Sequence, residues 1–265
     1  MTKEVDWLEL WRELVSRKLH PETESLVQKY RAHGQKHNER PDSLLDFVLK
    51  KIDPEDTAVD IGAGTGRWTI PLARKTRNVT AIEPVSGMVA MLKENLDYAN
   101  IKNVKILLQT WEDAALPVHD TAVCAHGMYG SPDLAEFVRK MERLARKGCY
   151  LAMRLPPADG ILSELSLQIY GCRHDSPDAM IAYNALYTMG IDVNILVETS
   201  IVNWFNQTME DAFIRAKRHL RIQMSDTTYD DLIHSTLKRR LNFSDGAYIW
   251  PDGMRSALLW WTPVH

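Results

Sequence analysis

The chain has 265 residues, of which 45% are hydrophobic and 25% charged, and its formal net charge is −3 at pH 7. This composition excludes a mostly disordered chain, and the length suits one large domain or one domain with an added lid. General affinity for nucleic acid depends on neutralising phosphates. The near balance of charge therefore speaks against nucleic acid as a partner and against a polybasic membrane anchor.

The cysteines are Cys124, Cys149 and Cys172, an odd and sparse set that does not form a disulfide framework. A reducing compartment is the simplest interpretation. The first residues contain no apolar signal core, and no segment approaches the run of about 18 apolar residues that a membrane span requires. We therefore expect a cytoplasmic protein without a membrane partner.

Hydrophobic periodicity predicts that the first fifty residues are largely helical. The expected helices cover residues 4–18, 22–32 and 42–51. From residue 57 onward strands alternate with helices, which is typical of βαβ crossovers and a mostly parallel sheet. The expected strands are 57–61, 79–82, 104–108, 121–125 and 149–155, and the expected helices between them are 67–75, 86–98 and 133–146.

The alternation changes after Pro156 and Pro157. Helices are expected at 160–171, 177–189, 207–221 and 227–240, with a strand at about 193–203. The last two apolar segments, 246–250 and 255–262, flank a Pro-Asp-Gly turn, and we expect them to pair as a hairpin.

The strongest chemical signal lies between the first expected strand and the helix after it. The sequence there is Val59-Asp60-Ile61-Gly62-Ala63-Gly64-Thr65-Gly66. Glycines at alternate positions let the backbone turn sharply and approach a ligand closely, at the helix N-terminus and the carboxyl ends of the strands. The second expected strand ends in Glu83, 21 residues beyond Gly62, where a carboxylate can accept both hydroxyls of a ribose.

Other ligand-binding loops fit this segment less well. A dinucleotide site expects GxGxxG, and here Arg67 stands where the third glycine would be. The GxxxxGK[ST] pattern of phosphate-binding loops is absent from the sequence. A tight turn without any ligand would leave Glu83 unexplained.

These residues resemble the class I methyltransferases that use S-adenosylmethionine. Asp60 to Gly66 is similar to the first motif of that family, and Glu83 matches its ribose-binding acid. Residues 83–88 are similar to the D/E-P-S-x-x-M variant, whose final apolar residue, here Met88, covers the adenine; Val85 departs from the usual Ser. Residues 109–113 correspond to the segment that holds the adenine amino group, and residues 125–129 to the segment beside the methyl group.

The resemblance implies an α/β fold: a Rossmann-like, doubly wound, mostly parallel seven-stranded sheet of order 3-2-1-4-5-7-6. Its antiparallel seventh strand would be 257–262. We expect a single methyltransferase domain. Within it, 1–50 would be an N-terminal helical cap, 51–155 the cofactor-binding core, 156–191 a helical insertion after strand 5, and 192–265 the completion of the sheet.

The cofactor implied is S-adenosyl-L-methionine, with S-adenosyl-L-homocysteine as product. The cofactor-binding residues implied are Asp60, Gly62, Ala63, Gly64, Thr65, Gly66, Glu83, Pro84, Met88, Thr110, Trp111, Glu112 and His126, with Tyr30 from the segment before the first core helix. For two of them a role in the fold without any ligand contact is an alternative. Asp60 can be satisfied by the amides of its own loop, and Trp111 can be an ordinary core side chain.

His126 and Tyr129 are the polar candidates for catalysis beside the methyl group. Methyl transfer is an in-line displacement, which gains much of its rate from positioning and needs a base only when the acceptor must lose a proton. The alternative for His126 is a hydrogen bond to backbone at the strand end. Arg154, at the end of the fifth strand, can face the pocket and attract an acidic substrate.

His33 and His37 lie four residues apart, but HGQKH lacks the Glu of HExxH, and no metal is expected. With Tyr30 they belong to a segment that can fold over the cofactor. Leu155-Pro156-Pro157-Ala158 departs at both ends from the [DNS]PP[YF] tetrad of amino-methylating enzymes, so we expect it only to end the strand.

The function expected from the sequence is S-adenosylmethionine-dependent methyl transfer to a small-molecule acceptor. One alternative is a methyltransferase acting on RNA or protein. Another is a binding protein that keeps the cofactor fold without turnover. The spacing of the glycines disfavours a nucleotide-dependent oxidoreductase.

Overall fold

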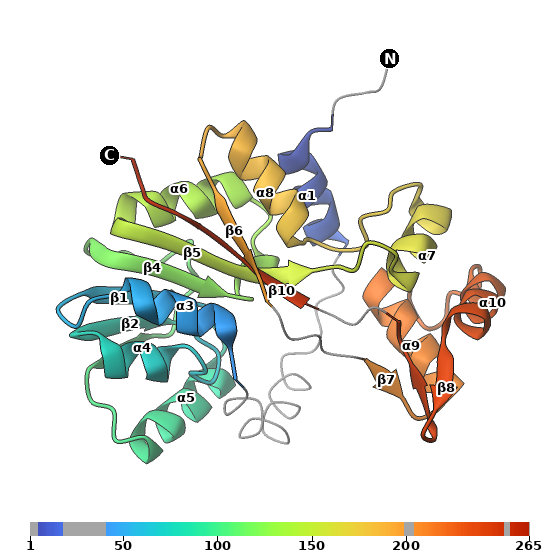
Figure 1. Ribbon diagram of the computed structural model, residues 1–265, viewed down its shortest axis with the longest axis horizontal. Helices are drawn as coiled ribbons and strands as arrows, with labels where there is room; N and C mark the ends of the chain where they lie inside the picture. The colour runs from blue at the N-terminus through green and yellow to red at the C-terminus, as the bar shows by residue number, and fades with distance from the viewer. Residues whose placement is uncertain (1–4, 18–40, 199–203, 252–254, 265) are drawn as a thin grey trace.

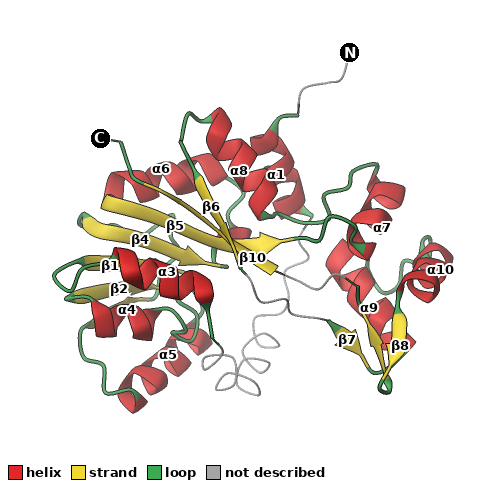
Figure 2. Ribbon diagram, viewed as in Figure 1, coloured by secondary structure: helices red, strands yellow, loops and turns green. Residues whose placement is uncertain are grey.

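A seven-stranded sheet with helices on both faces forms the centre of the protein (Figure 2). The computed structural model describes residues 5–17, 41–198, 204–251 and 255–264. The strands of the sheet are β1 (Thr57–Ile61), β2 (Asn78–Ile82), β3 (Val104–Leu107), β4 (His119–Ala125), β5 (Ala145–Leu155), β6 (Asn194–Val197) and β10 (Arg255–Trp261). Their order is β3-β2-β1-β4-β5-β10-β6, with β10 antiparallel to both neighbours. The predicted fold class and strand order are confirmed.

The helices divide between the two faces of this sheet (Figure 1). One group is α1 (Trp7–Ser16), α6 (Leu134–Leu144) and α8 (Ala179–Thr188), and the other is α3 (Ser43–Lys51), α4 (Thr69–Lys75) and α5 (Ser86–Tyr98). Each group packs on the sheet through its own hydrophobic cluster. Trp11 of α1 is fully buried, and its indole N–H donates to the carbonyl of Ser131 over 2.9 Å. No helix in the described segments is both long and apolar enough to cross a membrane.

A smaller unit, which we call the cap, stands beside the carboxyl end of the sheet (Figure 1). The cap contains α7 (Ile161–Tyr170), β7 (Phe205–Asn206), α9 (Met209–Leu220), α10 (Asp230–Arg240), β8 (Asn242–Ser244) and β9 (Ala247–Ile249). Its helices share a hydrophobic cluster separate from those of the sheet. Lys217 is fully buried there, and its ammonium group donates to Asp230 over 2.7 Å and to the Asp226 carbonyl. The cap therefore has its own core.

The hairpin expected over 246–262 is wrong. β9 pairs with β7 and β8 in the three-stranded sheet of the cap, whereas β10 pairs with β5 and β6 in the main sheet. Leu258 and Leu259 are both fully buried, as a strand covered on two faces requires, and this places β10 in the centre of the main sheet. Residues 192–265 thus complete the sheet only through β6 and β10, and 204–250 belong to the cap.

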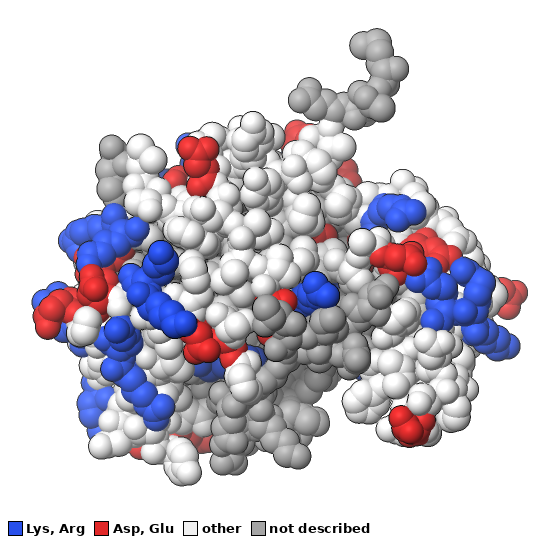
Figure 3. Space-filling view, in the orientation of Figure 1, with Lys and Arg blue, Asp and Glu red and all other residues white. Residues whose placement is uncertain are grey.

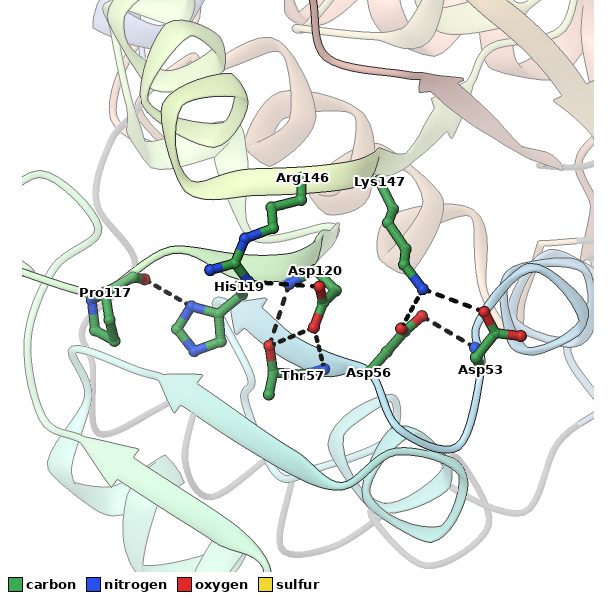
Figure 4. A network of polar contacts seen from close by, with 8 residues as sticks. All are labelled: Asp53, Asp56, Thr57, Pro117, His119, Asp120, Arg146 and Lys147. Carbon is green, nitrogen blue, oxygen red and sulfur yellow. Dashed lines mark hydrogen bonds and ion pairs between the residues drawn. The ribbon is translucent and has the colours of Figure 1, made fainter. Parts of the chain in front are cut away.

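Charged side chains join the amino-terminal ends of β1, β4 and β5 (Figure 4). The Asp120 carboxylate accepts hydrogen bonds of 2.9 Å from both the amide and the hydroxyl of Thr57, and it pairs with Arg146. Burial alone would raise the pKa of Asp120, but these hydrogen bonds and the guanidinium lower it overall. Lys147 pairs with Asp56 over 2.5 Å. Side chains of this edge of the sheet thus satisfy one another.

Candidate active site

A cavity of about 710 Å³ opens at the opposite edge, between the carboxyl ends of the strands and the cap. Its walls include Gly62 after β1, Glu83 after β2, His126 after β4 and Arg154 near the end of β5. The chain runs from β1 to β2 and β3 on one side and returns to β4 on the other, so β1 and β4 flank the switch point of the sheet. Ligands of open α/β sheets bind in the crevice at this point.

The glycine loop is held against β2 by its own amides. The N–H groups of Gly62 and Ala63 both donate to the Ile82 carbonyl over 2.9 Å. Gly62 has φ of +73°, and a β-carbon there would lie 2.8 Å from Cα of Gly127 in the loop after β4. The two loops therefore touch backbone to backbone. Such a loop lets a ligand approach the backbone closely. The N–H groups of Gly62 and Ala63 already donate within the protein, so they are not used to bind a ligand.

Glu83 joins the end of β2 to the glycine loop. One carboxylate oxygen accepts the N–H of Gly64 and the other accepts the N–H of Val85, both over 2.9 Å. Burial raises the pKa of Glu83, and the two backbone hydrogen bonds oppose that rise. A carboxylate has about four lone-pair sites, so two remain for hydroxyl donors in the cavity.

Asp60 is buried at the end of β1 and also lines the cavity. Its carboxylate accepts a hydrogen bond of 2.6 Å from the Thr69 hydroxyl of α4. Burial raises the pKa of Asp60 to about 6; the Thr69 hydrogen bond opposes the rise, and the charge of Glu83 adds to it. The partner shown is thus a helix hydroxyl, which the sequence did not indicate.

Replacing Asp60 with Asn should stabilise the protein at pH 8. The pKa of the folded state, about 6, lies above the ordinary 3.8, so stability falls as pH rises between these values and stays lowered above them. At about 1.4 kcal/mol per pKa unit, the gain in unfolding free energy is about 2–3 kcal/mol. Urea unfolding at pH 8 and pH 4 measures it. A gain that does not shrink at pH 4 would contradict the assignment.

The predicted site residues divide into two groups. Those that line the cavity are Asp60, Gly62, Ala63, Gly64, Thr65, Glu83, Pro84, Met88, His126 and Tyr129. Those that do not line it are Gly66, Thr110, Trp111 and Glu112. A β-carbon on Gly66 would lie 2.6 Å from the Leu92 side chain, so this glycine serves the packing of the loop on α5. Tyr30, His33 and His37 fall outside the described residues.

Trp111 lies in this structure as a core side chain, which is the alternative to an adenine contact. Its side chain is buried in the core, and its indole N–H donates to the Phe137 carbonyl of α6 over 3.2 Å. The hydroxyl of Thr110, which is half-buried, donates to the Asp113 carboxylate over 2.7 Å, and Glu112 is exposed and accepts the Ser131 hydroxyl over 2.7 Å. The segment after β3 turns toward α6, which carries these side chains away from the cavity.

His126 and Tyr129 lie together at the end of β4. His126 has φ of +58°, a left-handed conformation that is uncommon for a residue with a side chain and that gathers at functional sites. The Tyr129 hydroxyl lies 3.2 Å from Nδ1 of His126 and accepts the backbone N–H of Arg154 over 2.5 Å. Burial raises the pKa of Tyr129, so its hydroxyl stays neutral.

A polar cluster at the cap end of the cavity was not predicted, apart from Arg154. Arg154 pairs with Asp175, and Nε2 of His219 on α9 lies 2.9 Å from the same carboxylate. Burial alone would raise the pKa of Asp175, but Arg154 and His219 lower it overall. Burial lowers the pKa of His219. These partners come from β5, a loop and the cap, so no local sequence signal could have found them.

The described residues include no group of three or more His, Cys, Asp or Glu side chains placed to hold a metal ion. The arrangement instead combines two carboxylates and a closely approaching loop at one end with arginine and histidine at the other. A ligand carrying hydroxyls and positive charge fits the first end without any phosphate-binding group.

Residues 58–148 match the family model described as "Methyltransferase domain". A protein of Methanosphaera stadtmanae named "Probable ribosomal RNA small subunit methyltransferase A" is 35% identical over 79 residues, which cover 29% of this chain and 28% of that protein. A protein of Methanocaldococcus jannaschii named "Probable cobalt-precorrin-6B C(15)-methyltransferase (decarboxylating)" is 36% identical over 62 residues, covering 23% of this chain and 34% of that one. The alignments span about a third or less of these relatives.

Among solved structures, the YcgJ protein of Bacillus subtilis superposes with a TM-score of 0.56 at 16% identity, covering 82% of this chain and 96% of that one. This likeness shows the fold. The names of the relatives correct one expectation from the sequence. A small-molecule acceptor was expected and nucleic acid was disfavoured as a partner, whereas one of these relatives is named for ribosomal RNA. Net charge is an average over the whole chain and does not report on one surface. Residues 58–148 thus match a methyltransferase domain, and the fold around them is the Rossmann-like fold that the resemblance to class I methyltransferases implied. S-adenosylmethionine is the methyl donor of that family.

Proposed function

We propose that this protein binds S-adenosylmethionine in the cavity and transfers its methyl group to an acceptor that enters from the cap side. The observation that carries the proposal is Glu83. Its carboxylate is fixed by the amides of Gly64 and Val85 and keeps two lone-pair sites, which is what the two hydroxyls of a ribose require. The glycine loop beside it supplies close approach, and Met88 and Pro84 line the same wall.

The chain's own residues then have distinct tasks. Glu83 orients the sugar, and Asp60 places negative charge near the bound positive groups. The cofactor, when bound, supplies an electrophilic methyl carbon. His126 faces the acceptor region and is oriented by the Tyr129 hydroxyl, so we assign it as a positioning residue. The rate gain rests on holding the reactants together and keeping water out, because displacement at carbon needs little proton transfer.

For the acceptor we place RNA first, on the strength of the relative named for ribosomal RNA. The near-neutral net charge does not oppose this. Figure 3 shows that basic side chains gather in separate regions of the visible face, with acidic ones among them. Local basic regions of this kind can meet a phosphate backbone even where the net charge is balanced.

Thermal unfolding with added ligands tests the cofactor. S-adenosylhomocysteine at 100 times its Kd should raise the unfolding free energy by about 2.7 kcal/mol, whereas NAD should leave it unchanged. Stabilisation by NAD alone would remove the cofactor assignment. The acceptor is tested by transfer of labelled methyl from S-adenosylmethionine to a cell extract. Label that becomes soluble after ribonuclease treatment supports RNA, and label that resists the treatment refutes it.

A further inference from the structure

The cap end of the cavity carries three arginines, which we call the arginine cluster: Arg154, Arg221 and Arg255. Arg154 lies near the end of β5, Arg221 is the residue that ends α9, and Arg255 begins β10. They come from the main sheet and from the cap, and all three line the same space. The fold therefore brings three guanidinium groups around one end of the cavity.

The charge of this cluster is only partly balanced. Arg154 pairs with the buried Asp175. Within the described segments, no carboxylate lies within ion-pair distance of Arg221 or Arg255. The only hydrogen bond of the Arg221 guanidinium in these segments is a long one, 3.5 Å, to the Arg218 carbonyl. Arg221 is partly buried, and a cation in such a place is costly unless an anion or hydrogen-bond acceptor meets it.

Two further features point into this space. Arg221 has φ of +64°, the left-handed conformation that glycine most often takes after a helix, and here an arginine accepts that conformation. The Nε–H of Arg154 is buried and has no hydrogen-bond acceptor among the described residues. Trp204 also lines the cavity beside His219, at a ring-centroid distance of 6.3 Å.

The two ends of the cavity thus differ in charge. Asp60 and Glu83 lie at the glycine-loop end, where a sulfonium cofactor also carries positive charge. The arginine cluster lies at the cap end, which also carries the Glu198 carboxylate, an acceptor of the Ser256 N–H over 3.2 Å. A negatively charged partner would there meet two guanidinium groups that have no carboxylate within ion-pair distance among the described residues. Guanidinium groups bind carboxylate and phosphate oxygens with paired, charge-assisted hydrogen bonds.

We propose that the arginine cluster binds an anionic oxygen group of the methyl acceptor, a phosphate or a carboxylate, and so holds the acceptor opposite the cofactor. The assignment of this anion to the acceptor rests on the proposed function. The binding of an anion at the cluster does not, and it can be measured by itself.

The test is a titration of the protein with sodium phosphate against sodium chloride at matched ionic strength, followed by thermal unfolding. The unmodified protein should show saturable stabilisation by phosphate. Arg221→Gln, and separately Arg255→Gln, should weaken phosphate binding about tenfold or more. Arg218→Gln is the matched control, because Arg218 is exposed on the same helix and does not line the cavity. Equal phosphate binding in all four proteins would overturn the proposal.

The same titration on protein saturated with S-adenosylhomocysteine separates this proposal from the proposed function. Phosphate should bind with unchanged affinity, because the two ligands occupy different ends. Mutual exclusion would mean that the arginines hold the cofactor's own carboxylate, and the anion site would be refuted while the cofactor site stands. Competition by acetate or by a short RNA then distinguishes the two sources, a carboxylate acceptor or a nucleic-acid phosphate. Failure of S-adenosylhomocysteine to bind while phosphate does would count against the proposed function alone.

Discussion

Glu83→Ala should weaken binding of S-adenosylhomocysteine by about 10- to 100-fold, which corresponds to about 1–3 kcal/mol for lost hydrogen bonds to a charged group. The substitution removes both oxygens that we assign to the ribose. It also releases the amides of Gly64 and Val85, which the carboxylate holds at 2.9 Å. Glu83→Gln keeps one acceptor oxygen, so its affinity for S-adenosylhomocysteine should lie between those of the unmodified protein and Glu83→Ala. Calorimetric titration of the three proteins measures the series.

Glu112→Ala is the control for this series. The sequence places Glu112 among the cofactor-binding residues, but the structure leaves it exposed, bonded to Ser131 and away from the cavity. Its loss should leave the affinity for S-adenosylhomocysteine unchanged. A large loss in Glu112→Ala, or none in Glu83→Ala, would show that the adenosyl group lies elsewhere.

Gly127→Ala should have the other large effect, on both stability and cofactor binding. A β-carbon at this position would lie 2.7 Å from the Ile61 carbonyl oxygen and 3.1 Å from Cα of Gly62. Both neighbours are backbone atoms, so the loops after β1 and β4 must move apart. We expect a loss of about 1–3 kcal/mol in unfolding free energy, as for other overpacking changes, and at least tenfold weaker binding of S-adenosylhomocysteine. Urea unfolding and calorimetric titration measure the two effects.

The matched control is Gly130→Ala, three residues along the same segment. No atom lies within 4 Å of a β-carbon built there, so the added methyl group meets open space. Its stability and affinity should equal those of the unmodified protein. If both alanine variants behaved alike, the backbone contact between Gly62 and Gly127 would not be what shapes the cavity.

Local features of the sequence were predicted well because the forces behind them act over a few residues. The strand 57–61 and the helix 86–98 have the bounds expected, since each depends on its own apolar pattern and on the glycine or proline beside it. The glycine loop and Glu83 lie where the motif places them, because a strand–turn–helix unit fixes their spacing. The strand order came with the resemblance to a known family, and the structure confirms it.

The path of the chain after β3 could not be predicted from local pattern. Trp111 follows a strand at the position where the resemblance implies an adenine contact, yet its indole packs under α6 and bonds the Phe137 carbonyl. An aromatic side chain buries the same area against a ligand or against a helix, so residue type alone does not distinguish the two.

What the sequence by itself determined about this protein is the alternation of strands and helices and the places of the glycine loop and Glu83 in it. Only the tertiary structure decided that β10 leaves β9 to join the main sheet, and that Arg154, Asp175 and His219 meet at the cap. The physical reason is the range of the contacts. Arg154 contacts Asp175, 21 residues away, and His219, 65 residues away. Contacts over such separations depend on how whole helices and strands pack together.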